Sequence, residues 1–205
     1  MTDATNPLLH PSGLPYELPD FRAIRPEHYL PAFEVAFAEH RREIDAITRA
    51  RSAPPFENTL AAIERAGETL DRVAHVFYTV SSADARAEIQ QIEEVLAPLM
   101  AAHEDAIRLD ERLYWRVAQV HERLDDIELT AEQRYLVQRH FREMTHAGAA
   151  LDAEAKATLT ALNQRLSSLS TTFEKNLLAD TNDLAVAFDD VTALAGLSTG
   201  ELSAA

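Results

Sequence analysis

The chain has 205 residues, of which 46% are hydrophobic and 26% are charged, and none is cysteine. This length and apolar content suffice for one large domain with a full core, and without cysteine there is no disulfide, thiolate metal site or thiol nucleophile. Acidic residues number 34 against 19 basic ones, for a net charge of -15, which repels phosphate backbones and anionic lipid. We therefore expect no nucleic acid or membrane partner. Because residues 1–13 lack a signal-peptide pattern, we expect a cytoplasmic location.

Prolines dominate the first part of the chain, and each restricts its own φ angle and favours an extended conformation in the residue before it. The segment also carries apolar side chains that are costly to leave in water. These are Leu8, Leu9, Leu14, Tyr16, Leu18, Phe21 and Ile24. We predict that residues 1–25 form an extended strap packed on a helical bundle; a disordered proline-rich tail is the alternative.

From residue 26 to residue 178, apolar residues recur at steps of three and four, the spacing of amphipathic helices. Prolines, glycines and capping residues divide this stretch into six helices. The expected helices cover about residues 26–47, 58–77, 84–107, 110–124, 130–148 and 151–178. Gly67 falls inside the second, and we interpret it as a point where a neighbouring backbone comes close. The pattern predicts an all-α fold, an up-and-down multi-helix bundle over residues 26–180.

The longest unbroken pattern is residues 151–178, a helix of about 40 Å at 1.5 Å per residue. Its apolar row comprises Leu151, Ala155, Leu159, Leu162, Leu166, Leu169, Phe173 and Leu177. A helix with so narrow an apolar row is not stable alone, so we predict a core helix covered by the earlier ones. Beside the row lies a serine- and threonine-rich patch, residues 167–172, interpreted as small residues that allow close helix packing or bond back to the helix.

The last part of the chain changes character. Residues 184–188 alternate apolar side chains with smaller or acidic ones, which predicts a short β-strand bounded by Asp189 and Asp190. Residues 198–201 have the spacing of a capping box, which begins a new helix. We therefore expect residues 181–205 to form a strand and turn that lead into a truncated helix. A lone strand and a four-residue helix need partners, so we expect the chain to be a fragment.

The spacing of the potential metal ligands does not predict a site. A zinc-binding helix commonly presents two histidines four residues apart, as in H-E-x-x-H. His103 and His121 are each followed by glutamate, but Ile107 and Asp125 occupy the position of the second histidine. His40 and His103 lie on apolar stripes and are interpreted as hydrogen-bonded core residues. With no glycine-rich phosphate loop or G-x-S-x-G motif either, we expect no catalytic, cofactor-binding or metal-binding residue in this chain.

Seven segments carry a resemblance to a known family, collinear along nearly the whole chain. They are NPLL at 6–9, LPDFRAIRPEHYLPAFEVA at 18–36, PPFENTLAAIERAG at 54–67, RVAHVFYTVSSAD at 72–84, APLMAAHEDAIRLDERLYWRV at 97–117, AGAALDAEAKATLTALNQRLSSLSTTFEKNLLADT at 147–181 and DDVTALAGLS at 189–198. Together they resemble the N-terminal region of the thimet oligopeptidase-like zinc metallopeptidases, closest to the bacterial peptidyl-dipeptidase and oligopeptidase A branches.

This resemblance implies an all-helical fold with a deep central channel that admits short peptides and excludes folded proteins. The family's zinc ligands and catalytic glutamate lie beyond residue 205, so the resemblance assigns zinc to the full-length parent and none to this chain. It implies two partners, the missing C-terminal catalytic region and short peptide substrates. This chain would be an inactive wall of the channel that restricts substrate size. Whether the parent acts as a peptidyl-dipeptidase or an endo-oligopeptidase depends on groups near the zinc.

Two other hypotheses remain. The chain could be a free-standing helical module that binds peptides or a partner protein without catalysis, or an independent metal enzyme that uses its scattered histidines. Exposed apolar surface distinguishes the module from the fragment. A fragment should leave a bare patch around residues 184–197 and on one flank of the long helix, whereas an independent module should cover that surface.

Overall fold

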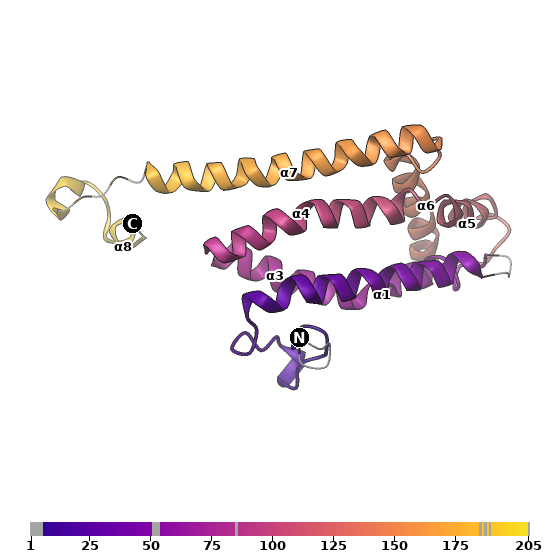
Figure 1. Cartoon of the computed structure of the whole chain (residues 1–205), viewed down its shortest axis with the longest axis horizontal. Coiled ribbons are helices and arrows are strands. Elements are labelled where there is room, and N and C mark those ends of the chain that lie inside the picture. Colours follow the sequence, from indigo (N-terminus) through magenta and orange to yellow (C-terminus); the bar gives the residue numbers. More distant parts are fainter. Residues whose placement is uncertain are drawn as a thin grey trace. The chain divides into compact units, whose positions relative to one another are not determined.

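The computed structural model describes residues 6–50, 54–84, 86–184, 186, 188 and 190–204. Its α-helices are α1 (Tyr29–Arg49), α2 (Leu60–Arg65), α3 (Glu68–Ala83), α4 (Ala87–Arg108), α5 (Glu111–Glu122), α6 (Ala131–Ala147), α7 (Ala153–Asp183) and α8 (Thr199–Ala204) (Figure 1). Short 3-10 turns span Pro15–Glu17, Pro26–His28 and Val191–Leu194. The prediction of an all-α, multi-helix fold is confirmed. None of the described helices combines the length and apolar character needed to cross a membrane.

The chain divides into two compact units, Met1–Thr171 and Thr172–Ala205, and the division falls within α7. In the first unit, α1, α3 and α4 pack against one another (Figure 1). Aromatic rings join α1 to α3, since the Phe77 ring meets the edges of Tyr29 and Phe33 at centroid distances of 5.1 and 5.8 Å. Edge-to-face pairs of this kind add to the free energy gained by burial alone. Ile89 and Leu96 of α4 complete this core.

A second core lies where the C-terminal half of α1 meets α2, α5 and α6. Its unusual member is Arg116 of α5, whose side chain is only 2% exposed. Its guanidinium donates to the Ala50 carbonyl at 2.9 Å, to Asn58 Oδ1 at 2.9 Å and to Thr59 Oγ1 at 3.3 Å. Burial lowers the pKa of Arg116, but these acceptors keep the buried cation solvated. The arginine thereby ties α5 to the ends of the segment that joins α1 to α2.

Hydrogen bonds from side chains to backbone carbonyl oxygens attach the start of the strap to the helices. Arg72 of α3 donates to the carbonyl oxygens of Leu8 and Leu9 at 3.3 and 3.1 Å, and Asn6 donates to the carbonyl of His28 at 2.8 Å. Leu8 is buried in the first core. Four other apolar residues of the strap remain exposed. These are Leu14, Tyr16, Leu18 and Phe21.

The prediction of one helix over residues 58–77 is wrong, because the structure has two helices there, α2 and α3. Gly67 stands between them with φ of +87°, a conformation that residues with a Cβ rarely adopt. Its N–H donates to Glu43 Oε2 at 2.8 Å. A Cβ at this position would lie 3.0 Å from the ring of His40. The close neighbour is therefore a side chain of α1 and not, as expected, a backbone.

The helix starts predicted near residues 110 and 130 and the end predicted at 148 agree with the structure, whereas α4 begins at Ala87 instead of 84 and α7 continues to Asp183 instead of 178. Asp110 caps α5 by accepting from the N–H of Leu113, and Thr130 forms a capping box with Gln133 at the start of α6. Gly148 ends α6 with φ of +97°. These caps satisfy backbone groups that a helix end leaves without partners.

In the second unit, the predicted strand over residues 184–188 is not seen. Leu184 lies in a turn after α7, Val186 and Phe188 adopt no regular structure, and Ala185 and Ala187 lie outside the described residues. No neighbouring strand is present among the described residues to pair with it, and a lone strand leaves its backbone groups unpaired. The helix predicted to follow is present as α8, where the Ser198 N–H donates to Glu201 Oε2 at 2.7 Å.

Candidate interaction surface on α7

The two histidines on apolar stripes lie together in the first unit. His103 Nε2 is 3.1 Å from His40 Nδ1, and the His103 ring lies 4.6 Å from that of Phe37. Only 3% of His103 is exposed. Burial lowers the pKa of His103 to about 4 and also lowers the pKa of His40, because the interior disfavours the charged imidazolium. Both are therefore neutral near pH 7. The interpretation as a hydrogen-bonded core residue is confirmed for His103, whereas His40 bonds to it from a half-buried position.

The remaining histidines are distributed over separate contacts. His140 pairs with Glu64 at 2.7 Å, whereas His121 stacks on Phe141 with ring centroids 4.0 Å apart. Within the described ranges, no three histidine, aspartate or glutamate side chains gather into a group that could hold a metal ion. The part of the chain that the structure describes thus offers no donor set for zinc.

The long helix α7 meets α4 through polar contacts. Asn163 donates to both carboxylate oxygens of Asp105, at 2.9 and 3.1 Å, and the Ser167 hydroxyl donates to the carbonyl oxygen of Ala97 at 3.0 Å. Among residues of the serine-rich patch, Ser168 and Thr171 bond back to the carbonyls of the preceding turn. The patch therefore does what was expected of small hydroxyl residues, and it brings α7 against α4.

This packing leaves the leucine row uncovered, so the prediction that α7 is a core helix is wrong. No side chain of α7 is buried, and Leu162, Leu166 and Leu169 are 58, 63 and 55% exposed. At about 100° per residue, this row lies roughly 100° around the helix from Asn163 and Ser167. The helix consequently meets α4 with its small polar side and leaves its apolar side in water.

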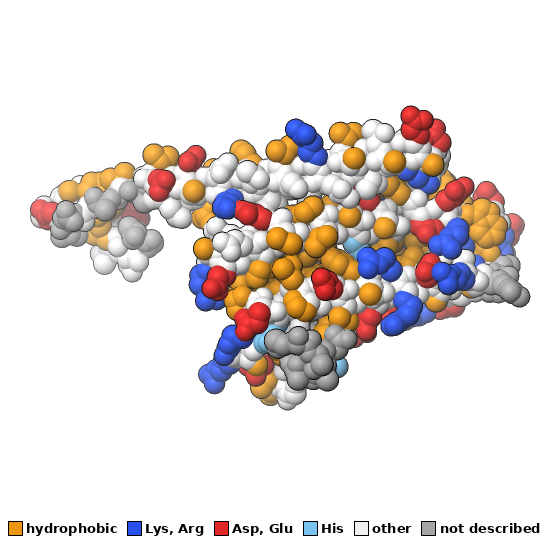
Figure 2. Space-filling view, in the orientation of Figure 1, with side chains coloured by type: hydrophobic (Ala, Val, Ile, Leu, Met, Phe, Trp, Pro, Cys, Tyr) orange, Lys and Arg blue, Asp and Glu red, His pale blue; other side chains and the backbone are white. Residues whose placement is uncertain are grey.

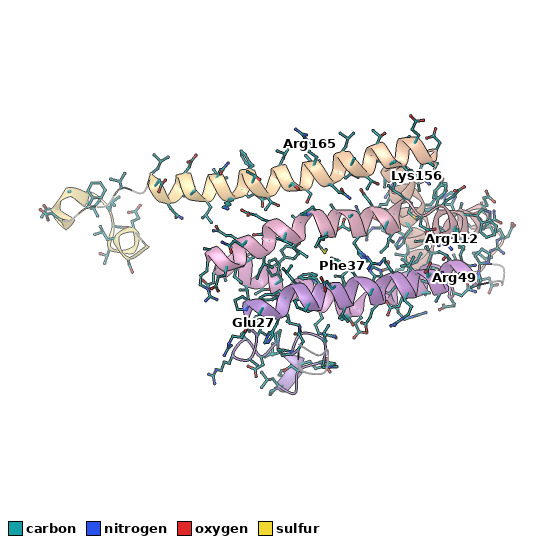
Figure 3. The ribbon with its side chains drawn as sticks, in the orientation of Figure 1. Glu27, Phe37, Arg49, Arg112, Lys156 and Arg165 are labelled. Carbon is teal, nitrogen blue, oxygen red and sulfur yellow. The ribbon has the colours of Figure 1, made fainter. Side chains whose placement is uncertain are left out.

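Figure 3 shows the same division in two labelled side chains. Arg165 projects from the side of α7 opposite α4, whereas Lys156 lies on the side that faces α4. The Asn163 and Ser167 contacts lie on the Lys156 side, about two and three turns further along the helix. The leucine row thus runs along a flank of α7 between these two directions.

The second unit also exposes apolar side chains. Phe173 and Leu177 of α7 are 66 and 55% exposed, and the residues that follow α7 have similar exposure. They are Leu184, Val186, Phe188 and Leu197. Exposed apolar side chains are thus present at both places where a fragment was expected to leave them, on one flank of the long helix and among the described residues of 184–197. Single exposed apolar residues are ordinary, but runs of them mark interaction surfaces.

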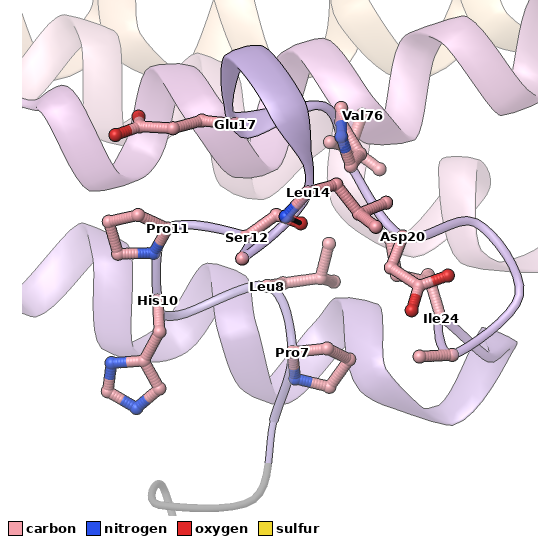
Figure 4. Close-up of a pocket in the computed structure, with 13 residues that line it drawn as sticks. Pro7, Leu8, His10, Pro11, Ser12, Leu14, Glu17, Asp20, Ile24 and Val76 are labelled. Carbon is pink, nitrogen blue, oxygen red and sulfur yellow. Dashed lines mark hydrogen bonds between the residues drawn. The ribbon is translucent and has the colours of Figure 1, made fainter.

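Other surface features in the first unit are weaker candidates. Figure 2 shows hydrophobic side chains gathered between α4 and α1, and α4 carries exposed Val95 and Leu99. Beneath the strap lies a hollow of about 340 Å³, into which Leu8, Leu14 and Val76 project (Figure 4). Because the strap itself lines almost all of this hollow, we interpret it as a gap in the packing and not as a binding site.

A larger hollow, of about 670 Å³, is lined by basic side chains of α4 and α6. Such a cluster could attract an anion in an otherwise acidic chain. However, Arg139 pairs with Glu143 at 2.8 Å, Arg108 with Glu104 at 3.5 Å, and His140 with Glu64. Neighbouring carboxylates thus offset most of its positive charge.

Comparison with known proteins gives a consistent result. No family model matches the chain. It is 38% identical over 202 residues to dipeptidyl carboxypeptidase of Salmonella typhimurium and 35% identical over 200 residues to that of Escherichia coli. It is 26% identical over 201 residues to oligopeptidase A of Salmonella typhimurium. Each match covers 98% of this chain, and the chain spans about 30% of the length of these relatives. The predicted resemblance is confirmed.

Proposed function

We propose that this chain is the N-terminal helical region of a zinc metallopeptidase that hydrolyses short peptides, as a peptidyl-dipeptidase or an oligopeptidase. In that protein it forms one wall of the substrate channel and restricts the size of the substrates that enter. Its partners are the C-terminal catalytic region of the same polypeptide and short peptides, and its compartment is the cytoplasm.

One observation carries the proposal. Similarity to two kinds of peptidase runs over 98% of this chain but covers only about 30% of each relative. A region that matches along its whole length and accounts for less than a third of its relatives fits a part of such an enzyme. The bare leucine row of α7 supports the same proposal, because an independent module would have that surface covered or polar.

The chemistry of peptide hydrolysis is assigned to the rest of the protein. When bound there, zinc would polarise the peptide carbonyl and lower the pKa of a bound water. In this proposal the residues of this chain take no part in that step. Their contribution is to shape the space that a peptide must cross before it reaches the reacting groups.

The experiment begins with the coding sequence beyond Ala205. The whole encoded protein should hydrolyse N-blocked peptides of three to ten residues, lose activity with a zinc chelator and regain it when zinc is added back. It should leave folded proteins intact. Residues 1–205 alone, assayed in parallel, should show no hydrolysis.

Two results would contradict the proposal. The first is a zinc-loaded whole protein that fails to cleave any peptide of the series. The second is a stop codon at position 206, combined with saturable peptide binding by the 205-residue chain in calorimetric titrations. That pair would support the free-standing binding module.

A further inference from the structure

We infer that Leu162, Leu166 and Leu169 of α7 form a docking row for the part of the same polypeptide that lies outside these 205 residues. The inference rests on the proposed function, because that function supplies the remaining polypeptide. It goes further by assigning the contact to one flank of one helix.

The geometry of α7 singles out this flank. The three leucines stand at i, i+4 and i+7, which places them one above another on the helix. Each is more than half exposed. The side of α7 that faces α4 is already occupied, since Asn163 and Ser167 make its polar contacts there. A row of large apolar side chains in water beside a satisfied polar face is a surface that lacks its partner.

A second copy of the chain fits this surface poorly. Each copy carries a net charge of -15, so two copies repel one another at moderate ionic strength. Three leucines also provide far less area than the roughly 800 Å² per partner of a stable interface. A short peptide fits poorly as well, since peptides and small ligands bind in concave sites and a helix flank is convex.

A segment of the same polypeptide does not face these limits. Because it is covalently attached, its effective concentration at α7 is of millimolar order for a short flexible connection, so a small apolar contact suffices. The relatives are about three times as long as this chain, which spans about 30% of each, and this leaves ample polypeptide to cover the row. The occupant is therefore expected to present an apolar face, for example a second amphipathic helix packed along α7.

Hydrogen exchange tests the contact without relying on activity. Backbone amides of residues 159–170 are compared in the whole encoded protein and in the 205-residue chain. Docking should slow their exchange at least tenfold in the whole protein. Leu166→Glu places a charge in the row and should restore the fast exchange. Ala161→Glu is the matched control, because Ala161 is exposed on another side of α7; it adds the same charge and should leave the protection intact.

The possible results separate this inference from the proposed function. Equal exchange in the two proteins, or protection that survives Leu166→Glu, overturns the docking row even if the whole protein hydrolyses peptides. Protection in the 205-residue chain that rises with its concentration overturns it in favour of a second copy. Protection that only Leu166→Glu removes supports the docking row, and it does so even in a whole protein that cleaves no peptide.

Discussion

Among the described residues, His103 has the most strongly shifted pKa, and its location explains the shift. Its ring is enclosed by Phe37 and His40, and the nearby Arg41 adds positive charge. Protonation would place an imidazolium in an apolar core beside a second histidine, where it is poorly solvated. A pair of neutral rings can share one hydrogen bond, with one ring as donor and the other as acceptor.

We predict that the free energy of unfolding falls as the pH is lowered from about 6.5 to about 4. In the folded chain the pKa of His103 is lowered from 6.5 to about 4, so the unfolded state binds more protons throughout that window. The stabilisation is complete above pH 6.5 and is lost as the pH falls, by about 3 kcal/mol in total at 1.36 kcal/mol per pH unit. Urea unfolding at several pH values measures this dependence.

His103→Phe provides the specific test, because it keeps a ring in the core and removes the titrating group. Its stability should change less between pH 6.5 and pH 4 than that of the parent. His146→Phe, at an exposed position of α6, also removes one histidine and should retain the parent's pH dependence. If the free energy of unfolding changed equally with pH in the parent and in His103→Phe, the pH dependence would arise from other groups.

Arg116 is the second residue whose role depends on burial. We predict that Arg116→Met lowers the free energy of unfolding by about 2 to 4 kcal/mol, because the buried acceptor Thr59 and the partly buried acceptors Ala50 and Asn58 lose this donor. Arg112, one turn earlier on α5, pairs with Asp45 and Asp110 at the surface. Arg112→Met should cost less than about 1 kcal/mol. If both variants lost the same free energy of unfolding, the hydrogen bonds of Arg116 would contribute little to stability.

The burial of Arg116 could not be predicted from the sequence. The apolar spacing of α5 identifies Leu113, Val117 and Val120 as core residues, and all three are buried. Arg116 stands next to that stripe and has the polarity of a surface residue. Only the acceptors around Asn58, more than fifty residues away in the chain, make its burial favourable, and no local pattern contains them.

At the scale of the element, two glycines with similar backbone angles differ in their surroundings. Gly67 and Gly148 have φ of +87° and +97°. A Cβ at Gly67 would lie 3.0 Å from the His40 ring, which is held by its bond to His103. A Cβ at Gly148 would lie within 3 Å of the tips of Leu151 and Leu159, which can rotate away.

We predict that Gly148→Ala costs about 1 to 2 kcal/mol, the cost of the left-handed conformation for a residue with a Cβ. Gly67→Ala should cost at least about 1 kcal/mol more, because the histidine ring cannot move without disturbing the core. Chemical denaturation of both variants gives the comparison. Gly13→Ala, where a Cβ meets nothing within 4 Å, should leave stability nearly unchanged. A smaller loss for Gly67→Ala than for Gly148→Ala would contradict this account.

Helix ends were more predictable than helix environments. Asp110, Thr130 and Gly148 act through neighbours within three or four residues, so their capping roles can be identified from local sequence. The interpretation of α7 failed for the opposite reason. Apolar spacing predicts which side of a helix is to be buried, but it does not identify the partner or show whether the partner lies within the same 205 residues. Here the contact with α4 uses Asn163 and Ser167 instead.

At the scale of the whole molecule, net charge and exposed apolar surface act against each other. The 205-residue chain carries a net charge of -15 at pH 7 and has a pI near 4.9. The charge keeps separate copies apart at neutral pH. As the pH approaches 4.9 this repulsion vanishes, while the exposed leucines of α7 remain available for contact.

We therefore predict that the 205-residue chain is monomeric at pH 7 in low salt and self-associates as the pH approaches 4.9. Light scattering, with far-UV circular dichroism to monitor helix content, follows both changes in one titration. Replacing Leu162, Leu166 and Leu169 together by Gln removes the apolar row without changing the charge, and should reduce the association at least severalfold. Association that begins only after helix content is lost would instead indicate acid unfolding, and association unaffected by the triple replacement would exclude the leucine row as its cause.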